Sequence, residues 1–178
     1  MECALDALRK AAMTGYRPAL LASRLCFLLG EHAEGSGRAT RLGAEGVRWG
    51  DFAVANGGDR VGAVHYFIAM NMGIAVRHEV VLAIRNLGRI EDELKRATEL
   101  DPETDDGGPP RVLGMLYFKA PSWPQGIGDP DKALELLAEV SREHPEHPLN
   151  ALFYAQVLWD VQGDEAKQEV RALSLIHI

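Results

Sequence analysis

The sequence predicts an all-α fold in which antiparallel helical hairpins follow one another along the chain. Apolar residues recur every three to four positions nearly throughout, which is the spacing of one helix face, and no run alternates as a strand would. Clusters of glycine and proline interrupt this pattern about once per helix length. The most informative interruption lies between residues 107 and 137, where a helix, a Pro/Gly-rich loop and a second helix succeed one another.

The expected helices are separated by turns rich in glycine, proline and polar residues. In chain order they cover residues 17–31, 38–56, 60–76, 78–100 and 111–119, with a further helix beginning at residue 130. The segment 78–100 suits either one long helix or a kinked pair. At the start of the chain, Ala4, Leu8 and Ala11 have the spacing of a second hairpin helix, so the chain is expected to open inside a hairpin.

Small residues line one face of the expected helix 38–56. Ala39, Gly43 and Gly46 recur there at helical spacing. Each glycine costs about 1 kcal/mol of helix stability relative to alanine. We therefore expect another helix to approach this face closely, because that contact would explain why the glycines are tolerated.

The hairpin between residues 107 and 145 has the spacing of a tetratricopeptide repeat. Pro109 and Pro110 suit a helix start, where a missing N–H costs nothing, and Asp129 and Pro130 suit the N-cap and first residue of the partner helix. The residues expected to pack this repeat are Gly114, Tyr117, Ala133, Leu137, Val140 and Pro145. The small ones let the helices approach, the larger ones fill the groove, and the proline turns the chain into the next hairpin. The loop is about seven residues longer than the usual 34-residue period implies.

We expect one helical-repeat domain over residues 1–172, in the form of a tetratricopeptide-like α-solenoid. A chain of 178 residues can bury roughly 70% of its unfolded-chain surface. The final segment, LSLIHI at 173–178, resembles the translation of a sequencing-library adapter; the alternative is a genuine helix end, since Ala166, Val170 and Leu173 keep the helical spacing. Together with the opening inside a hairpin, this segment predicts that the chain is a fragment.

The composition argues against several classes of function. An apolar fraction of 47% and a charged fraction of 25% are ordinary for a globular chain. The net charge of −7, with no basic cluster evident, argues against a nucleic-acid partner held by phosphate contacts. The apolar runs fall short of the roughly 20 residues that a membrane span needs, and MECALDALRK lacks the apolar stretch of a signal peptide.

We find no catalytic, metal-binding or cofactor motif. Cys3 and Cys26 match no metal or redox spacing, and Cys26 is expected to be a buried thiol on an apolar helix face. The P-loop, zincin and nucleophile-elbow patterns are missing. Residues 143–147 (EHPEH) offer four possible metal ligands, but these straddle the repeat-closing proline, so a solvated turn is favoured over a metal site. No enzymatic activity and no cofactor are expected.

Five residues are candidates for binding a ligand or a partner: Arg111, Trp123, Tyr66, Asn71 and Trp49. Trp123 lies in the long loop, where it either plugs the hairpin or covers a ligand. Arg111 follows two prolines in the first turn of a helix, a position unfavourable for a cation beside the helix dipole. It therefore either pairs with Asp105 or Asp106, or binds an anionic ligand.

The other three candidates are expected on helices that line the inside of the stack. Tyr66 and Asn71 belong to the apolar segment before residue 76, and Trp49 belongs to the glycine-containing helix. Asn71 needs a hydrogen-bond partner within that apolar segment, from a neighbouring helix or from a solute. His65 is expected to bond neighbouring backbone or carboxylate groups.

Residues 107–133, GGPPRVLGMLYFKAPSWPQGIGDPDKA, resemble the T-component of tripartite ATP-independent periplasmic (TRAP) transporters. The likeness extends from AVHYFIAMNMG at 63–73 to about Leu158. Proteins of this family are bacterial lipoproteins built from degenerate helical hairpins. The resemblance implies a periplasmic, lipid-anchored accessory protein that associates with a solute-binding protein. It also implies helices around a pore or cleft for a small hydrophobic or anionic solute.

Two functional hypotheses follow. The first is the accessory T-component of a periplasmic solute uptake system. The second is a generic tetratricopeptide scaffold that holds a peptide or protein partner in its concave groove, which would suit a cytoplasmic location. Self-association stays open in both cases, and an enzyme is least favoured because it rests only on scattered His and Glu residues.

Overall fold

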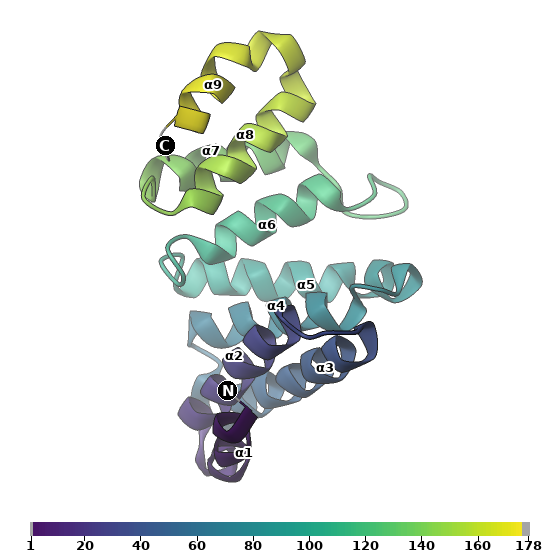
Figure 1. The fold of residues 1–178 in the computed structure, drawn as a ribbon, viewed down its shortest axis with the longest axis vertical. Helices are drawn as coiled ribbons and strands as arrows, with labels where there is room; N and C mark the ends of the chain where they lie inside the picture. Colours follow the sequence, from purple (N-terminus) through teal and green to yellow (C-terminus); the bar gives the residue numbers. More distant parts are fainter. Residues whose placement is uncertain (1, 176–178) are drawn as a thin grey trace. The chain divides into compact units, whose positions relative to one another are not determined.

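The computed structural model of the protein describes residues 2–175. Within this range the protein is all-helical and contains no β-strand (Figure 1). The helices group into two compact units, residues 1–101 and residues 102–178. The expectation of one domain over residues 1–172 stays a prediction.

The first unit contains five helices among its described residues, and each of them packs on the next. They are α1 (Glu2–Ala11), α2 (Tyr16–Glu31), α3 (Ser36–Ala53), α4 (Gly62–Val76) and α5 (Val80–Leu100). A 3₁₀ turn at Ala12–Thr14 joins α1 to α2. Between α3 and α4 the helix widens over Val54–Gly58, where Asn56 and Gly57 leave helical geometry, so the expected break between the helices at 38–56 and 60–76 is confirmed.

Helix α4 is the centre of the first unit. Its sequence is apolar on all sides, which is typical of a buried helix, and α2, α3 and α5 pack against it. Its fully or almost fully buried side chains include Val64, Tyr66, Ile68, Ala69, Met72 and Ile74. Each large apolar side chain buried in this way contributes about 1.5–3 kcal/mol to folding.

Glycines on α3 let α4 approach closely, as the sequence predicts. A Cβ added at Gly43 would lie 2.6 Å from the backbone nitrogen of Ala75. At Gly46 it would lie 2.1 Å from the Oδ1 atom of Asn71. A side chain at either position would push the two helices apart, which explains why the loss of helix propensity is tolerated.

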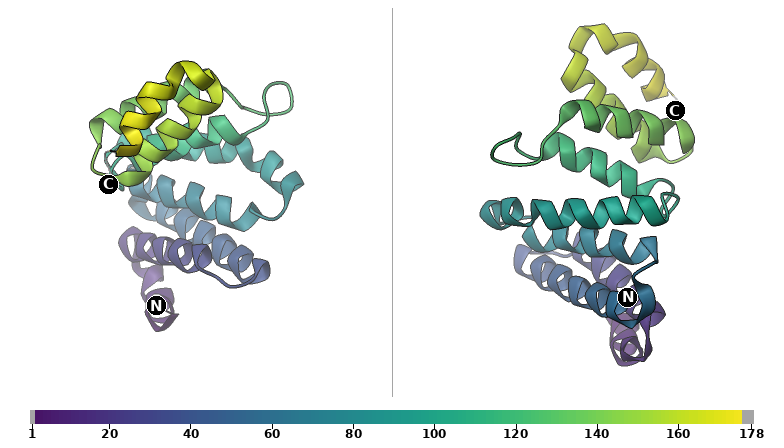
Figure 2. Two further views of the ribbon diagram at one scale, coloured as in Figure 1. Left: turned by 45° about the horizontal axis from the view of Figure 1, so that its top comes forward. Right: turned by 180° about the vertical axis from the view of Figure 1, so that it is seen from behind.

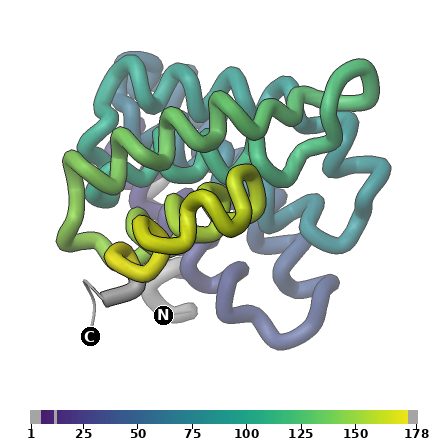
Figure 3. The backbone as a smooth tube through the Cα atoms, turned by 90° about the horizontal axis from the view of Figure 1, so that it is seen from above, coloured from purple at the N-terminus to yellow at the C-terminus, as the bar shows by residue number. Residues whose placement is uncertain are grey.

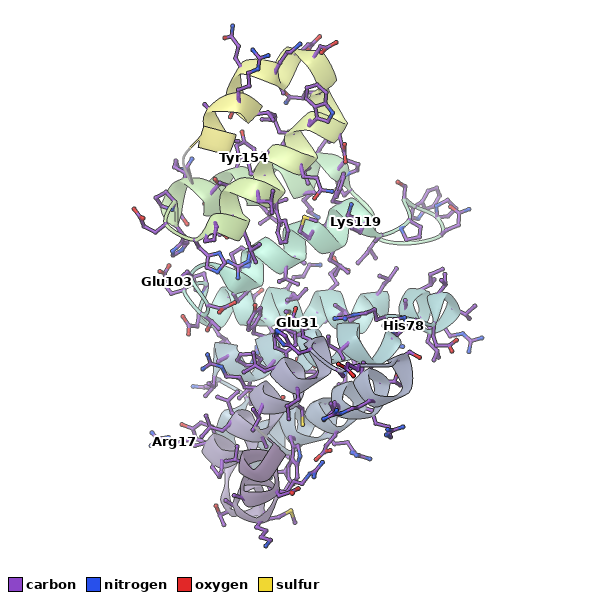
Figure 4. All side chains as sticks on the ribbon, in the orientation of Figure 1. Arg17, Glu31, His78, Glu103, Lys119 and Tyr154 are labelled. Carbon is purple, nitrogen blue, oxygen red and sulfur yellow. The ribbon has the colours of Figure 1, made fainter. Side chains whose placement is uncertain are left out.

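The second unit contains four helices among its described residues, again with each packed on the next. They are α6 (Gly108–Lys119), α7 (Pro130–Glu143), α8 (Pro148–Gln162) and α9 (Lys167–Leu175). A short 3₁₀ turn at Gly163–Ala166 leads into α9. Tyr154 on α8, labelled in Figure 4, donates a 2.6 Å hydrogen bond from its hydroxyl to Glu169 on α9.

Most of the helix starts and ends expected from proline and glycine are confirmed. Helix α6 starts with both prolines in its first turn. The side chain of Asp129 caps α7 by accepting a hydrogen bond from the Lys132 N–H at 3.1 Å. Helix α5 is a single long helix, so the kinked pair does not form. The chain is helical to Leu175, and residues 176–178 of the suspected adapter segment lie outside the described residues.

Candidate functional site

The loop between α6 and α7 presents Trp123 to solvent. In Figures 1 and 2 this loop, residues 120–129, stands out from the two helices that it joins, and it does so again in the view of Figure 3. Lys119, labelled in Figure 4, ends α6 at the base of the loop. The Trp123 side chain is 85% exposed, although tryptophan usually buries most of its surface.

Internal hydrogen bonds give the Trp123 loop a defined shape. The N–H groups of Gln125 and Gly126 both donate to the Ser122 carbonyl, at 3.1 and 3.2 Å. The Gly128 N–H donates to the Pro121 carbonyl at 2.8 Å. A Cβ at Gly128 would lie only 2.2 Å from the carbonyl oxygen of Ala120, so this path of the chain requires glycine.

The expectation that Trp123 plugs the α6–α7 hairpin is therefore wrong, because the loop bends back on its own backbone and leaves the indole exposed. The alternative, that Trp123 covers a ligand, stays a prediction. The two helices of the hairpin approach each other closely at Gly114: a Cβ added there would lie 2.8 Å from Cγ of Leu137. Tight packing at that point leaves no gap for a plug.

The repeat-packing residues form the inside of the second unit, with one exception. Gly114, Tyr117, Ala133, Leu137 and Val140 are all buried. Pro145 lies in the turn between α7 and α8, as expected of a proline that turns the chain into the next hairpin, but it is exposed and does not pack in the core. It prevents α7 from continuing rather than filling the core.

Arg111 is a buried cation that holds the loop before α6. Its side chain is 3% exposed and pairs with the half-exposed carboxylate of Asp105 at 2.9 Å. The guanidinium also donates to the backbone carbonyls of Asp105 (3.2 Å) and Asp106 (3.1 Å) and to Oδ1 of Asn150 (2.9 Å). His147 Nδ1 lies 3.4 Å away.

This network explains an unusual stretch of backbone. Asp105 and Asp106 both have positive φ angles, 58° and 51°, which cost non-glycine residues roughly 1 kcal/mol or more each. Arg111 from α6 and Asn150 from α8 bind the carbonyls of this strained loop from two sides. Of the two alternatives for Arg111, the pair with Asp105 is the one that forms.

Asn71 and Tyr66 lie inside the first unit. Tyr66 is 2% exposed and Asn71 is 0% exposed. The Asn71 amide donates to the carbonyls of Ser23 (2.9 Å) and Phe67 (2.8 Å), so a neighbouring helix supplies its expected partner. Its Oδ1 is buried without a hydrogen-bond partner and faces Gly46. The Asn71 side chain therefore joins α4 to α2 and faces α3, and both Asn71 and Tyr66 are buried.

Trp49 is half-buried on α3, beside a group of charged side chains. Its ring packs on the apolar cluster of Cys26 and Leu29, and its Nε1–H donates to Glu45 Oε1 at 3.2 Å. Cys26 is fully buried, as expected, and burial raises the pKa of its thiol to about 12. Trp49 therefore links the core of the first unit to Glu45 on its surface.

A basic groove borders Glu45, which corrects the expectation of no basic cluster. The arginine groove, as we call it, is a surface hollow of about 550 Å³ in the first unit. Four arginines and one carboxylate line it: Arg9 of α1, and Arg38, Arg41, Glu45 and Arg48 of α3. The α3 residues show helical spacing in the sequence, but the contribution of α1 depends on the fold.

One ion pair anchors this groove. Arg9 donates to both carboxylate oxygens of Glu45, at 2.7 and 2.6 Å, and to Asp6 at 2.6 Å. The hydrogen bond from Arg9 is the main cause that lowers the pKa of Glu45, and the Trp49 N–H acts in the same direction. Glu45 is therefore ionised at neutral pH, while Arg9 is satisfied by two carboxylates.

His65 pairs with Glu93 inside the first unit. The ring is 6% exposed; Nδ1 lies 2.7 Å from Glu93 Oε2, and Nε2 lies 2.9 Å from the Asp59 carbonyl. Both nitrogens face acceptors, which favours the doubly protonated ring. The bond to Glu93 is the largest cause that raises the pKa of His65 above its usual value.

The EHPEH turn lines a smaller hollow of about 300 Å³ together with Asp106. His144 Nε2 lies 3.6 Å from Glu103 Oε1, a loose contact between a half-buried ring and an exposed carboxylate. Among the residues that the structure describes, no three His, Cys, Asp or Glu side chains are arranged to hold a metal ion. Likewise, none of the described helices is both long and apolar enough to cross a bilayer.

Two comparisons with known proteins found no similar protein. The sequence matches no protein family in a scan against family models, and a search of curated proteins found no match. The resemblance to the TRAP T-component therefore depends on the residues of the segment between 63 and 158 alone.

Proposed function

We propose that this chain is a non-enzymatic helical-repeat protein that binds another protein, as the accessory T-component of a TRAP solute uptake system. In that role its partner is a solute-binding protein and its location is the periplasm, with the lipid anchor that the family resemblance implies. The role needs no cofactor and no metal.

The observation that carries this proposal is the outward position of Trp123 in an ordered loop. Tryptophan is enriched among the residues that dominate protein–protein affinity. A loop already held by its own hydrogen bonds loses little conformational entropy when a partner covers it. The same loop lies in residues 107–133, the segment on which the family resemblance depends.

We also propose that the hairpins form a tetratricopeptide-like α-solenoid. Support comes from the sequential packing of helices within each unit, since in repeat proteins each hairpin contacts its neighbours in the chain. The close contact of Gly114 with Leu137 is the packing that the repeat pattern requires. Such repeats present extended surfaces that suit protein partners.

The test is a binding titration of the full chain with the solute-binding protein encoded beside it in its source genome. We expect saturable binding, weakened roughly 30-fold by Trp123→Ala, the effect of losing an interface residue worth about 2 kcal/mol. Trp159→Ala is the matched control, because that indole lies in the same unit and is 43% exposed. It should change the affinity by less than about threefold.

Two results would count against this proposal in different ways. If no solute-binding protein binds, the transport role is wrong. If binding is tight but insensitive to Trp123→Ala, the transport role survives and the loop is not the contact.

The second candidate is a generic tetratricopeptide scaffold that holds a peptide or protein in a concave groove. It is favoured by a run of exposed apolar side chains at the start of α5: Val80 (74%), Val81 (62%), Leu82 (45%) and Ile84 (42%). Exposed apolar patches often mark binding surfaces. Here Val81→Glu should abolish binding of a peptide partner and Trp123→Ala should not, the reverse of the first proposal. Sedimentation of the chain alone would show whether the surface serves self-association instead.

A further inference from the structure

Two arginines of the arginine groove are without a carboxylate partner among the described residues. Arg9 is matched by Glu45 and Asp6. Arg41 and Arg48 form no hydrogen bond or ion pair with any side chain in the described part of the chain. Apart from the Arg9–Glu45 pair, the charged residues that line the groove in the described part of the chain are arginines, and of these Arg38 has an interaction of its own.

The choice of side chain points to oxyanions. A guanidinium is planar and offers paired donors that match carboxylate and phosphate groups, whereas a lysine supplies only a point charge. Among the described residues, the cationic groups that line this groove are all arginines. From Arg38 to Arg48 the helix rises about 15 Å, and a hollow of about 550 Å³ is in the range of small-molecule sites.

We propose that the arginine groove binds a small oxyanion ligand with two or more negative charges, carried on phosphate or carboxylate groups. Arg41 and Arg48 contact the ligand. Glu45 holds Arg9 in place and limits how much negative charge the groove accepts. This inference does not depend on the proposed function, because the groove lies in the first unit and Trp123 in the second.

The experiment is a calorimetric titration of the full chain with pyrophosphate and, separately, with citrate, at a constant ionic strength of about 150 mM to screen weak surface attraction. Acetate is the monovalent control. We expect saturable binding of pyrophosphate, citrate or both, with no binding of acetate. Pyrophosphate alone would identify phosphate as the preferred group, and citrate alone would identify carboxylates.

Variants locate the site. Arg41→Gln and Arg48→Gln should each weaken binding roughly tenfold or more, because each removes a charge-assisted donor pair. Arg85→Gln is the matched control, an exposed arginine of α5 outside the groove. Circular dichroism checks that each variant is folded. Glu45→Gln should strengthen binding, since it removes the groove's negative charge and releases Arg9.

The inference is overturned by any of three results. The first is no saturable binding of either anion. The second is equal weakening by Arg85→Gln and Arg41→Gln, which would indicate general surface charge. The third is binding of an acidic peptide without binding of either small anion, which would make the groove a protein contact.

Discussion

Replacing Arg111 with alanine should destabilise the second unit severely. The substitution removes the donors to the carbonyls of Asp105 and Asp106 and to the amide oxygen of Asn150. It also empties the space of a side chain that is 3% exposed. The two aspartates have positive φ angles, so the released loop also loses what holds its strained conformation.

The size of the effect can be worked out from these contacts. Hydrogen bonds to a charged group contribute about 1.5–3 kcal/mol each and are not additive. The ion pair with Asp105 adds little, because that carboxylate is 49% exposed and regains water. The carbonyl of Asp106 keeps its bond from Asn150. We therefore expect a loss of about 2–4 kcal/mol, or on the order of 10–20 °C in the melting temperature of a unit of this size.

The assay is thermal unfolding followed by circular dichroism, combined with hydrogen exchange measured by mass spectrometry. Peptides from α6 and α8 should lose protection, while those from α2 to α4 should not. Arg142→Ala is the matched control, because that arginine is exposed on α7. It should change stability by less than about 0.5 kcal/mol. If Arg111→Ala behaves like this control, the structural role is wrong and an anion-binding role for Arg111 returns.

Three further predictions concern packing and titration. Gly114→Leu should lower the free energy of unfolding by about 1–3 kcal/mol, because it overpacks the α6–α7 contact. Gly88→Ala should raise it by about 0.5–1 kcal/mol, because Gly88 is an exposed position of α5 with open space around it. Urea unfolding measures both changes. The raised pKa of His65 stabilises the first unit below the usual histidine pKa near 6.5, and this contribution is lost as pH rises through the raised value. Glu93→Gln should flatten that pH dependence of unfolding; an unchanged profile would refute the pairing. Burial raises the pKa of Cys26 to about 12, so this thiol should resist alkylation at pH 8 until urea opens the unit, and rapid labelling of the native Cys26 peptide would contradict its burial.

Helix positions and the close helix contacts could be predicted from sequence because their causes are local. Proline and glycine end helices through their own backbone geometry, so the starts of α6 and α7 could be located. Glycines at helical spacing, as at Gly43 and Gly46, indicate a neighbouring helix even when that helix is unknown.

The direction of single side chains could not be predicted in the same way. Trp123 is exposed in a loop that its own backbone hydrogen bonds shape, and residue types alone do not reveal those bonds. For Arg111 the sequence left two partners open, and three-dimensional contacts with Asn150 on another helix decide between them.

The arginine groove was missed for a related reason. The net charge of −7 describes the whole chain and hides a local excess of the opposite sign. Arg9 and Glu45 are 36 residues apart in sequence, and only the packed fold brings α1 to the side of α3. The regular spacing of Arg38, Arg41 and Arg48 was the one available signal, and it marks a helix face without indicating a hollow.

The central claim, that this protein acts by binding a partner through the loop between α6 and α7, is tested most directly by a hydrogen-exchange footprint. The full chain would be measured alone and in the presence of the solute-binding protein encoded beside it. We predict slower exchange in residues 120–129 on complex formation, with Trp123→Ala removing the protection. A complex that protects other segments and leaves this loop unchanged would contradict the claim.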